Sequence, residues 1–189
     1  PAPVGADESV LSDGDIRVYR VGVERRPNAR LVALVEAKAS KPIMSRAAVA
    51  GKQVYMADVE NRIVAFELPS LTPGKTWPLA GQCAWGPQRV GRNVLLATDK
   101  DHLYCLDDRQ QLVWDVSLPH GSLVGEPLSI DDDCLVAARA GTVYRIDGAT
   151  GKELGRVDAG CPIATGPVLL EKRLVVGGRD GSLIELKRP

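Results

Sequence analysis

A repeat of 40 residues is the feature that most constrains how this chain can fold. Four segments align without a gap, and they start at Gly51, Gly91, Asp131 and Glu171. They read GKQVYMADVENRIVAFE, GRNVLLATDKDHLYCLD, DDDCLVAARAGTVYRID and EKRLVVGGRDGSLIELK. A period of this length is typical of architectures in which one small unit stacks on its neighbours. We therefore expect a single domain over residues 1–189, with repeats near 1–41, 42–81, 82–121, 122–161 and 162–189.

The repeats share apolar positions on both faces of a short strand. One shared position holds Ile63, Leu103, Val143 and Leu183. Another, three residues further on, holds Phe66, Leu106, Ile146 and Leu186. Because residues three apart on a strand point to opposite faces, both faces of each sheet must be covered. Sheets that stack between similar sheets meet that requirement.

Each aligned segment has two apolar runs joined by a polar turn, which predicts a β-hairpin. Residues that tolerate a positive φ stand at the turns, namely Glu60-Asn61, Lys100-Asp101, Ala140-Gly141 and Asp180-Gly181. Upstream of three hairpins a proline is expected to open a short strand, at Pro87, Pro127 and Pro167. A more polar strand follows each hairpin, most clearly at 112–118. Each repeat therefore predicts four antiparallel strands.

The N-terminal stretch fits a degenerate fifth copy of the repeat. Pro3-Val4 would be its opening strand and ESVLSDGDIRVYRV its hairpin, with Ile16 and Tyr19 at the shared apolar positions. Residues 30–37 could form a helix, but their β-branched content and the flanking repeats favour an outer strand. The chain begins at Pro1 with no initiator Met and no leader, as expected of a trimmed piece or a mature fragment.

Repeated four-stranded sheets that cover one another predict an all-β fold, a β-propeller of about five four-stranded antiparallel blades. Because the chain stops after a hairpin, the last blade is expected to be incomplete, with Lys187, Arg188 and Pro189 discouraging edge pairing. The alternative is the C-terminal part of a larger propeller, and we favour the five-bladed form. An open blade edge would also allow two copies to self-associate.

The segment YRIDGATGKELGRV, from Tyr144 to Val157, resembles the repeat of pyrroloquinoline-quinone-type (quinoprotein-like) β-propellers. In that family an apolar-Asp-x-x-Thr-Gly-Lys turn precedes an aromatic residue. Gly155 stands where the Trp is usual, whereas the preceding repeat keeps it as Trp114. The resemblance covers nearly the whole chain and implies fold more than activity. WD-type propellers compete, but their Gly-His pair is absent here.

Family membership would imply one of three kinds of function. The family includes quinone-dependent dehydrogenases, the propeller subunit of the outer-membrane β-barrel assembly machinery, and sensor domains of signalling proteins. The dehydrogenases need a longer chain, calcium-binding carboxylates and adjacent cysteines that stack on the quinone. This chain has roughly half that length and no adjacent Cys pair. The resemblance therefore implies no cofactor and no enzyme activity.

Composition argues against several classes of partner. Lys plus Arg and Asp plus Glu number 24 each, so no excess charge would attract nucleic acid or anionic lipid. The apolar runs are about five residues long, far below the roughly 20 of a membrane span. The four cysteines match no zinc or redox spacing and are expected to be buried thiols, with a disulfide as the alternative: Cys83, Cys105, Cys134 and Cys161. We expect no nucleic acid, no membrane span and no metal.

Residues just before each opening proline should lie at the mouth of the central channel. Arg46, Trp85 and Glu126 stand there and could form a polar and aromatic rim for a peptide or small ligand. Trp85 could instead cap the core between blades. Arg139 and Arg179 occupy equivalent hairpin positions, and they could either meet an acidic partner or be ordinary solvated arginines.

Other polar residues indicate no chemistry. His102 and His120 have no nucleophile motif near them, so both are expected to be solvated loop residues, and no catalytic residue is predicted. The run Asp131-Asp132-Asp133 lacks the alternating oxygen ligands of a calcium loop. Trp114 should face a neighbouring blade.

Two functions follow from these expectations. The first is a non-enzymatic scaffold or sensor-type propeller that binds a protein or peptide on one face, in the periplasm or another extracytoplasmic compartment. The second is a small-molecule or carbohydrate binding or hydrolytic domain that uses the central channel mouth.

Overall fold

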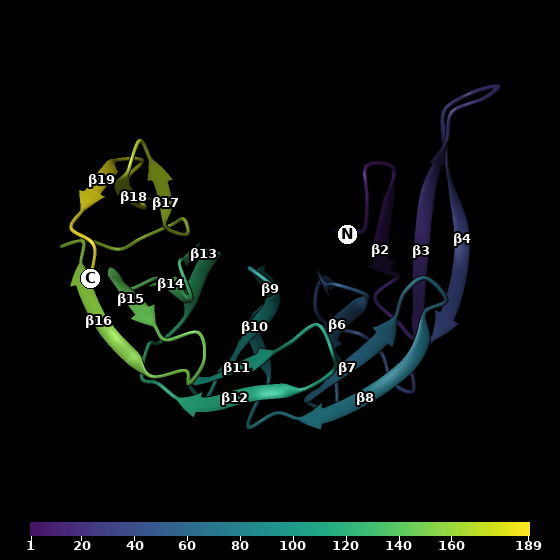
Figure 1. Ribbon diagram of the computed structural model, residues 1–189, viewed down its shortest axis with the longest axis horizontal. Helices are drawn as coiled ribbons and strands as arrows, with labels where there is room; N and C mark the ends of the chain where they lie inside the picture. The colour runs from purple at the N-terminus through teal and green to yellow at the C-terminus, as the bar shows by residue number, and fades with distance from the viewer.

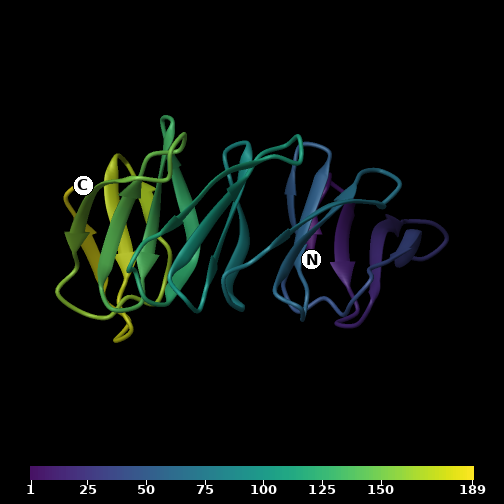
Figure 2. The same cartoon turned by 90° about the horizontal axis from the view of Figure 1, so that it is seen from below.

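The computed structural model describes residues 1–189 and consists of strands and connecting turns, with no helix. Nineteen strands form five separate antiparallel sheets. The sheets stand one after another along a curved path (Figure 1), and the side view shows them as separate units (Figure 2). This arrangement confirms the predicted all-β propeller. No segment of the structure is a helix long and apolar enough to cross a membrane.

The blades are numbered in chain order. Blade 1 contains β1 (Ala2–Pro3), β2 (Glu8–Ser12), β3 (Arg17–Glu24) and β4 (Arg30–Lys38). Blade 2 contains β5 (Ala48–Ala50), β6 (Gln53–Ala57), β7 (Arg62–Glu67) and β8 (Thr72–Pro78). Blade 3 contains β9 (Cys83–Val90), β10 (Asn93–Thr98), β11 (His102–Leu106) and β12 (Leu112–Ser117). Blade 4 contains β13 (Leu123–Ile130), β14 (Asp133–Ala138), β15 (Thr142–Ile146) and β16 (Glu153–Asp158). Blade 5 contains β17 (Val168–Leu170), β18 (Arg173–Gly177) and β19 (Leu183–Leu186).

Each blade is an up-and-down sheet that runs from the inside of the curve to its outside. β9 and β13 lie on the inner side in Figure 1, and β8, β12 and β16 lie on the outer rim. Blades 1 to 4 have four strands and blade 5 has three, as predicted for an incomplete last blade. Blades 1 and 5 stand apart at the two ends, so the five blades form an open arc and not a closed ring.

The hydrophobic core is divided among the junctions between neighbouring blades. Ile63, Leu103 and Val143 each face the following blade and are fully buried. The shared position three residues on, occupied by Leu106 and Ile146, faces the preceding blade and is also buried. Both faces of the inner blades are therefore covered, which is what the paired apolar positions predicted.

The hairpin turns adopt the left-handed backbone conformation that their residues suggested. φ is 57° at Asn61, 54° at Asp101, 126° at Gly141 and 87° at Gly181. Asp131, the first residue of the acidic run, has φ of 51° in the turn between β13 and β14. That residue therefore shapes a tight turn, a role that Asp tolerates better than most residues.

The register predicted for blade 1 is wrong by two residues. The carbonyl of Ile16 accepts a hydrogen bond from the Ala39 amide, just as the carbonyl of Asn61 accepts one from Leu79. Ile16 is thus the equivalent of Asn61, and the fully buried Val18 is the equivalent of Ile63. Because of the insertion before blade 2, the alignment of the repeats did not give this register. The outer strand predicted over residues 30–37 is confirmed as β4.

The expectation that a proline opens each inner strand is wrong in blades 3 and 4. β9 and β13 begin four residues before Pro87 and Pro127, at Cys83 and Leu123. The ladders to β10 and β14 are irregular near these prolines. A bulge accommodates a residue that has no amide hydrogen to donate, so the strand can continue on both sides.

Candidate functional site

Four of the five predicted binding residues line one groove on the inner side of the arc. The groove has a volume of about 440 Å³, and it includes Arg46, Trp85, Glu126 and Arg139. Trp85 lies in β9 and Glu126 in β13, while Arg139 directly follows β14. The inner strands of adjacent blades therefore bring together residues that are far apart in sequence.

Trp85 forms the floor of this groove, and its indole is not part of an open rim. Its side chain packs in the core cluster between blades 3 and 4, and the residue is only 8% exposed. Its Nε1 donates a hydrogen bond to the carbonyl of Gly125 over 2.8 Å. Both features agree with the interpretation that Trp85 caps the core between blades. Its burial and its hydrogen bond therefore stabilise mainly the junction between two blades.

Gly125 is required where the inner strands come close together. Its φ is 64°, and a Cβ at this position would overlap the backbone nitrogen of Gly166 in the next repeat. Two glycines thus let β13 approach the segment that precedes β17. This close approach fixes the position of Glu126, which follows Gly125 directly.

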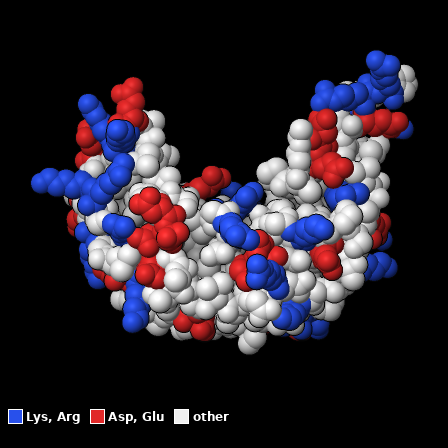
Figure 3. All heavy atoms as spheres, viewed as in Figure 1, with Lys and Arg blue, Asp and Glu red and all other residues white.

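The charged side chains of the groove are exposed and carry no internal partner. Arg46, Glu126 and Arg139 are exposed, and none of them forms a side-chain hydrogen bond or an ion pair in the structure. A smaller cavity of about 240 Å³ shares Arg46 and Glu126 with the groove and adds Arg89. Basic and acidic side chains are seen together at the inner edge of the arc (Figure 3). With three arginines and one glutamate, these residues give the inner surface an excess of positive charge.

Arg179 lies outside the groove. Its amide donates to the carbonyl of Pro162, as the amide of Arg139 donates to Ser122, so the two arginines do hold equivalent turn positions. Arg139 is among the groove residues, whereas Arg179 is not. The structure therefore brings Arg46, Trp85, Glu126 and Arg139 together and leaves Arg179 on the neighbouring blade.

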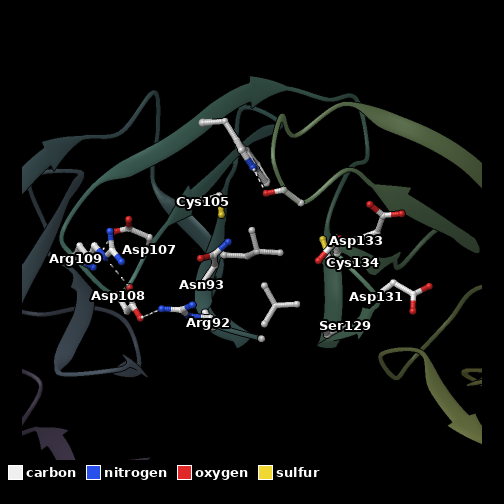
Figure 4. Close-up of a pocket in the computed structure, with 16 residues that line it drawn as sticks. Arg92, Asn93, Cys105, Asp107, Asp108, Arg109, Ser129, Asp131, Asp133 and Cys134 are labelled. Atoms are coloured by element: carbon white, nitrogen blue, oxygen red, sulfur yellow. Dashed lines mark hydrogen bonds and ion pairs between the residues drawn. The ribbon is translucent and has the colours of Figure 1, made fainter.

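A second cavity, about 470 Å³ in volume, opens between blades 3 and 4 (Figure 4). Its deeper wall includes Leu95, Trp114 and the thiols of Cys105 and Cys134. Its rim is rich in charge, with five aspartates and two arginines: Arg92, Asp107, Asp108, Arg109, Asp131, Asp132 and Asp133. Sequence reasoning did not identify this cavity. Residues 91–93 align with the acidic run 131–133 one repeat later. This alignment would have placed the turns that contain them at equivalent positions of adjacent blades.

The chemistry of this second cavity is limited. Burial raises the pKa of Cys134 to about 12. Burial, with a smaller effect of nearby Cys134, raises that of Cys105 to about 12 as well. Both thiols are therefore protonated at neutral pH and are poor nucleophiles. Part of the acidic rim is neutralised, because Asp108 pairs with Arg92 at 3.1 Å and Asp133 with Arg145 at 2.7 Å. No group of three or more His, Cys, Asp or Glu side chains is arranged to hold a metal ion.

The remaining cysteines and histidines contribute no reactive group to the groove. All four cysteines are free, and Cys83 and Cys161 are half-buried. The prediction that His120 is solvated is wrong, since the residue is 4% exposed. Its loop folds inward because the His120 amide donates to the carbonyl of Leu118 and the Gly121 amide donates to Asp101.

Comparisons with known proteins agree with this fold. Residues 99–188 match the family model described as outer membrane protein assembly factor BamB. The crystal structure of BamB from Moraxella catarrhalis superposes with a TM-score of 0.73 and 17% identity, over 96% of this chain and 55% of that chain. No curated protein matches the chain.

Two other solved propellers show the same architecture. The structure of BBS1N in complex with ARL6DN gives a TM-score of 0.69 at 12% identity, over 95% of this chain and 56% of that one. The C-terminal WD40 domain of Sif2 gives 0.68 at 10% identity, over 99% and 56%. At these identities the matches establish the fold alone, and the chain spans a little more than half the length of each structure.

The family model and the solved structures agree on one type of repeat. The model covers blade 5 and blade 4 and reaches into blade 3, and the superposition with BamB extends the same architecture to the N-terminal blades. The chain is therefore similar to BamB in sequence pattern over residues 99–188 and in its propeller fold over nearly its whole length.

Proposed function

We propose that this chain is a non-enzymatic scaffold that binds an acidic, extended segment of a partner protein in its inner groove. The observation that supports the proposal best is the set of exposed, unpaired charges around that groove. Arg46 and Arg139 stand on blades 2 and 4, and Arg89 extends the basic surface through the adjoining cavity. A segment that crosses the inner strands would meet all three.

The chemistry of these side chains suits carboxylates. A guanidinium group can hold a carboxylate through two parallel hydrogen bonds, and its charge is kept at any physiological pH. Glu126 would repel an acidic residue placed beside it and attract a Lys or Arg, which would fix the register of the bound segment. Because the inner strands are rigid, binding would cost these side chains and their backbone little conformational entropy.

The groove offers little for catalysis. The thiol among its residues, that of Cys83, has its pKa raised to about 11 by burial, so it is a weak nucleophile at neutral pH. A binding role also agrees with the family description, an assembly factor for outer membrane proteins. For the same reason an extracytoplasmic compartment forms part of this proposal.

The experiment compares the groove with an equivalent site outside it. The wild-type chain, Arg46→Glu with Arg139→Glu, and the control Arg179→Glu serve as baits in separate envelope and cytosolic extracts. Proteins retained after cross-linking are identified by mass spectrometry. We expect a partner that is captured by the wild type and by Arg179→Glu and is lost with the double variant. Equal capture by all three chains would refute a role for the groove.

A small polar ligand is the second candidate, because a cavity of about 440 Å³ falls within the size range of small-molecule sites. Such a ligand, a carbohydrate for example, would raise the thermal stability of the wild type. The rise should disappear with Arg46→Ala or Glu126→Ala. If a ligand stabilises the wild type and both variants equally, this second function is excluded.

A further inference from the structure

The cavity of about 470 Å³ lies between blades 3 and 4, each of which has a neighbouring blade on both sides. Figure 4 shows Asn93 and Cys105 on the blade 3 side and Ser129 and Cys134 on the blade 4 side. The deeper wall is well buried, because Leu95 and the two cysteines are at most 3% exposed. The volume falls within the size range of small-molecule sites. The cavity therefore offers a small ligand a largely buried surface.

The junction between blades 2 and 3 shows what fills the equivalent space one repeat earlier. Tyr55 of β6 is fully buried there, and its hydroxyl donates a hydrogen bond to the carbonyl of Asp107 over 2.7 Å. The repeat alignment places Leu95 at the same position of blade 3. Leucine is shorter than tyrosine and carries no hydroxyl. The junction between blades 3 and 4 thus lacks a phenol group that the preceding junction has.

A polar side chain is missing at the same junction. Gln110 and Gly151 hold equivalent positions, with φ of 58° and 73°, in the turns after the third strands of blades 3 and 4. Gln110 reaches across to Gln53 at 2.8 Å, whereas Gly151 has no side chain that could reach Asn93. Asn93 therefore lines the cavity. The repeat itself identifies the missing groups as an aromatic ring and a polar substituent.

The rim of the cavity favours a positively charged ligand. Five aspartates and two arginines line the cavity, and Arg145 beside Asp133 adds a third positive charge. Asp131 and Asp132, in the turn between β13 and β14, are exposed and form no ion pair. An amino group at the rim would form charge-assisted hydrogen bonds with these carboxylates, whereas an anionic group would be repelled.

We propose that this cavity binds a small aromatic amine, with the ring against Leu95 and the ammonium group at the acidic turn 131–132. The ring takes the place that the ring of Tyr55 has one junction earlier. The buried thiols of Cys105 and Cys134 suit this position, because sulfur makes favourable contacts with aromatic rings. The site is separate from the inner groove and adds a small-molecule ligand to the proposed scaffold function.

Three probes of similar size test the charge requirement by isothermal titration calorimetry with the full chain. Tyramine carries the ring of tyrosine and an ammonium group, 4-ethylphenol is neutral, and 4-hydroxyphenylacetate is an anion. We expect saturable one-to-one binding of tyramine. 4-Ethylphenol should bind about tenfold more weakly, because it lacks the ammonium group. 4-Hydroxyphenylacetate should bind at least about tenfold more weakly still, because the aspartates repel its carboxylate.

The substitution Leu95→Tyr tests the position of the ring. A tyrosine there would fill the cavity as Tyr55 fills its own junction, so the affinity for tyramine should fall at least about tenfold. The control Leu154→Tyr adds the same side chain on the outer strand β16, where Leu154 is 53% exposed, and should leave binding unchanged. Circular dichroism and thermal melting verify that both variants fold.

A charge variant tests the position of the ammonium group. Asp131→Asn with Asp132→Asn should weaken tyramine binding about tenfold and leave 4-ethylphenol binding within about twofold. Asn tolerates the left-handed conformation of Asp131, whose φ is 51°, so the turn is retained. The control Glu171→Gln with Glu185→Gln removes the same charge from blade 5, outside the cavity, and should change neither affinity.

Three outcomes would overturn the proposal. One is the absence of saturable tyramine binding up to millimolar concentration. Another is equal affinity for tyramine and 4-hydroxyphenylacetate. The third is full tyramine binding by a folded Leu95→Tyr variant or, if that variant does not fold, by the variant that lacks both aspartates. The double reversal of Arg46 and Arg139 should leave tyramine binding intact, so this proposal and the groove can fail independently.

Discussion

The indole Nε1 of Trp114, on the outer strand of blade 3, donates a hydrogen bond to the carbonyl of Gly148 in blade 4 over 3.0 Å. The ring also covers Gly151 of the same loop, so that a Cβ on this glycine would meet the indole carbons at 2.6 Å. The loop from Asp147 to Gly151 carries the Thr-Gly turn of the repeat. One tryptophan thus joins two blades by packing and by a directed contact.

Replacing Trp114 separates these two contributions. Trp114→Ala should lower the free energy of unfolding by about 3 to 5 kcal/mol, because a large buried ring is removed. Trp114→Phe keeps most of the packing and should cost about 1 kcal/mol more than the same change at the half-buried Trp77, whose indole has no hydrogen-bond partner. Denaturant unfolding measures both. A loss below about 1 kcal/mol for Trp114→Ala would contradict the interblade role.

Two glycines with similar backbone angles test the close approach of the inner strands. Gly125 has φ of 64° and Gly160 has φ of 73°, but nothing lies within 4 Å of a Cβ at Gly160. Gly160→Ala should therefore cost only the strain of the left-handed conformation, about 1 to 2 kcal/mol. Gly125→Ala adds a clash with the backbone of Gly166 and should cost at least about 2 kcal/mol more. Equal melting temperatures for the two variants would show that the inner strands can move apart.

The blades could be predicted because every repeat has the same pattern of apolar residues and turn residues. The positions of Ile63 and Phe66 required a sheet covered on both faces, and the turn residues Asn61 and Gly141 identified the hairpins. Blade 1 was harder, since an insertion displaced its register and made Ile16 look like a core residue. The sequence left open whether the blades form a five-bladed propeller or part of a larger one, because no single repeat encodes the rotation between neighbouring blades.

The groove was predictable and the second cavity was not. Residues at equivalent positions of successive inner strands must lie near one another, which brought Arg46 and Glu126 together. A cavity depends on how completely side chains fill a junction. Between blades 2 and 3, Gln110 reaches across to Gln53 at 2.8 Å, whereas Asn93, the equivalent of Gln53, lines an open cavity. Such differences in side-chain reach require coordinates.

The buried thiols provide a chemical test of the interblade core. Since burial raises the pKa of Cys105 and Cys134 to about 12, both thiols stay protonated at pH 8. Iodoacetamide should therefore modify neither residue in the native protein and both after unfolding. The half-buried Cys161 serves as an internal control that should react first. Rapid native alkylation of Cys134, located by peptide mass spectrometry, would mean that the junction between blades 3 and 4 opens readily.

Acid stability should depend on the turn that precedes β16. Asp147 accepts hydrogen bonds from the Thr150 hydroxyl, the Thr150 amide and the Ala149 amide, and these bonds lower the pKa of Asp147 below its ordinary value. A depressed pKa in the folded state means that the stabilisation is present above the unfolded pKa and is lost as pH falls through the folded pKa. Asp147→Asn should therefore lower the melting temperature at pH 7 and have less effect below pH 3. The control Asp115→Asn, on the exposed face of β12, should change neither value, and an equal loss for Asp147→Asn at both pH values would show that its charge is not the cause.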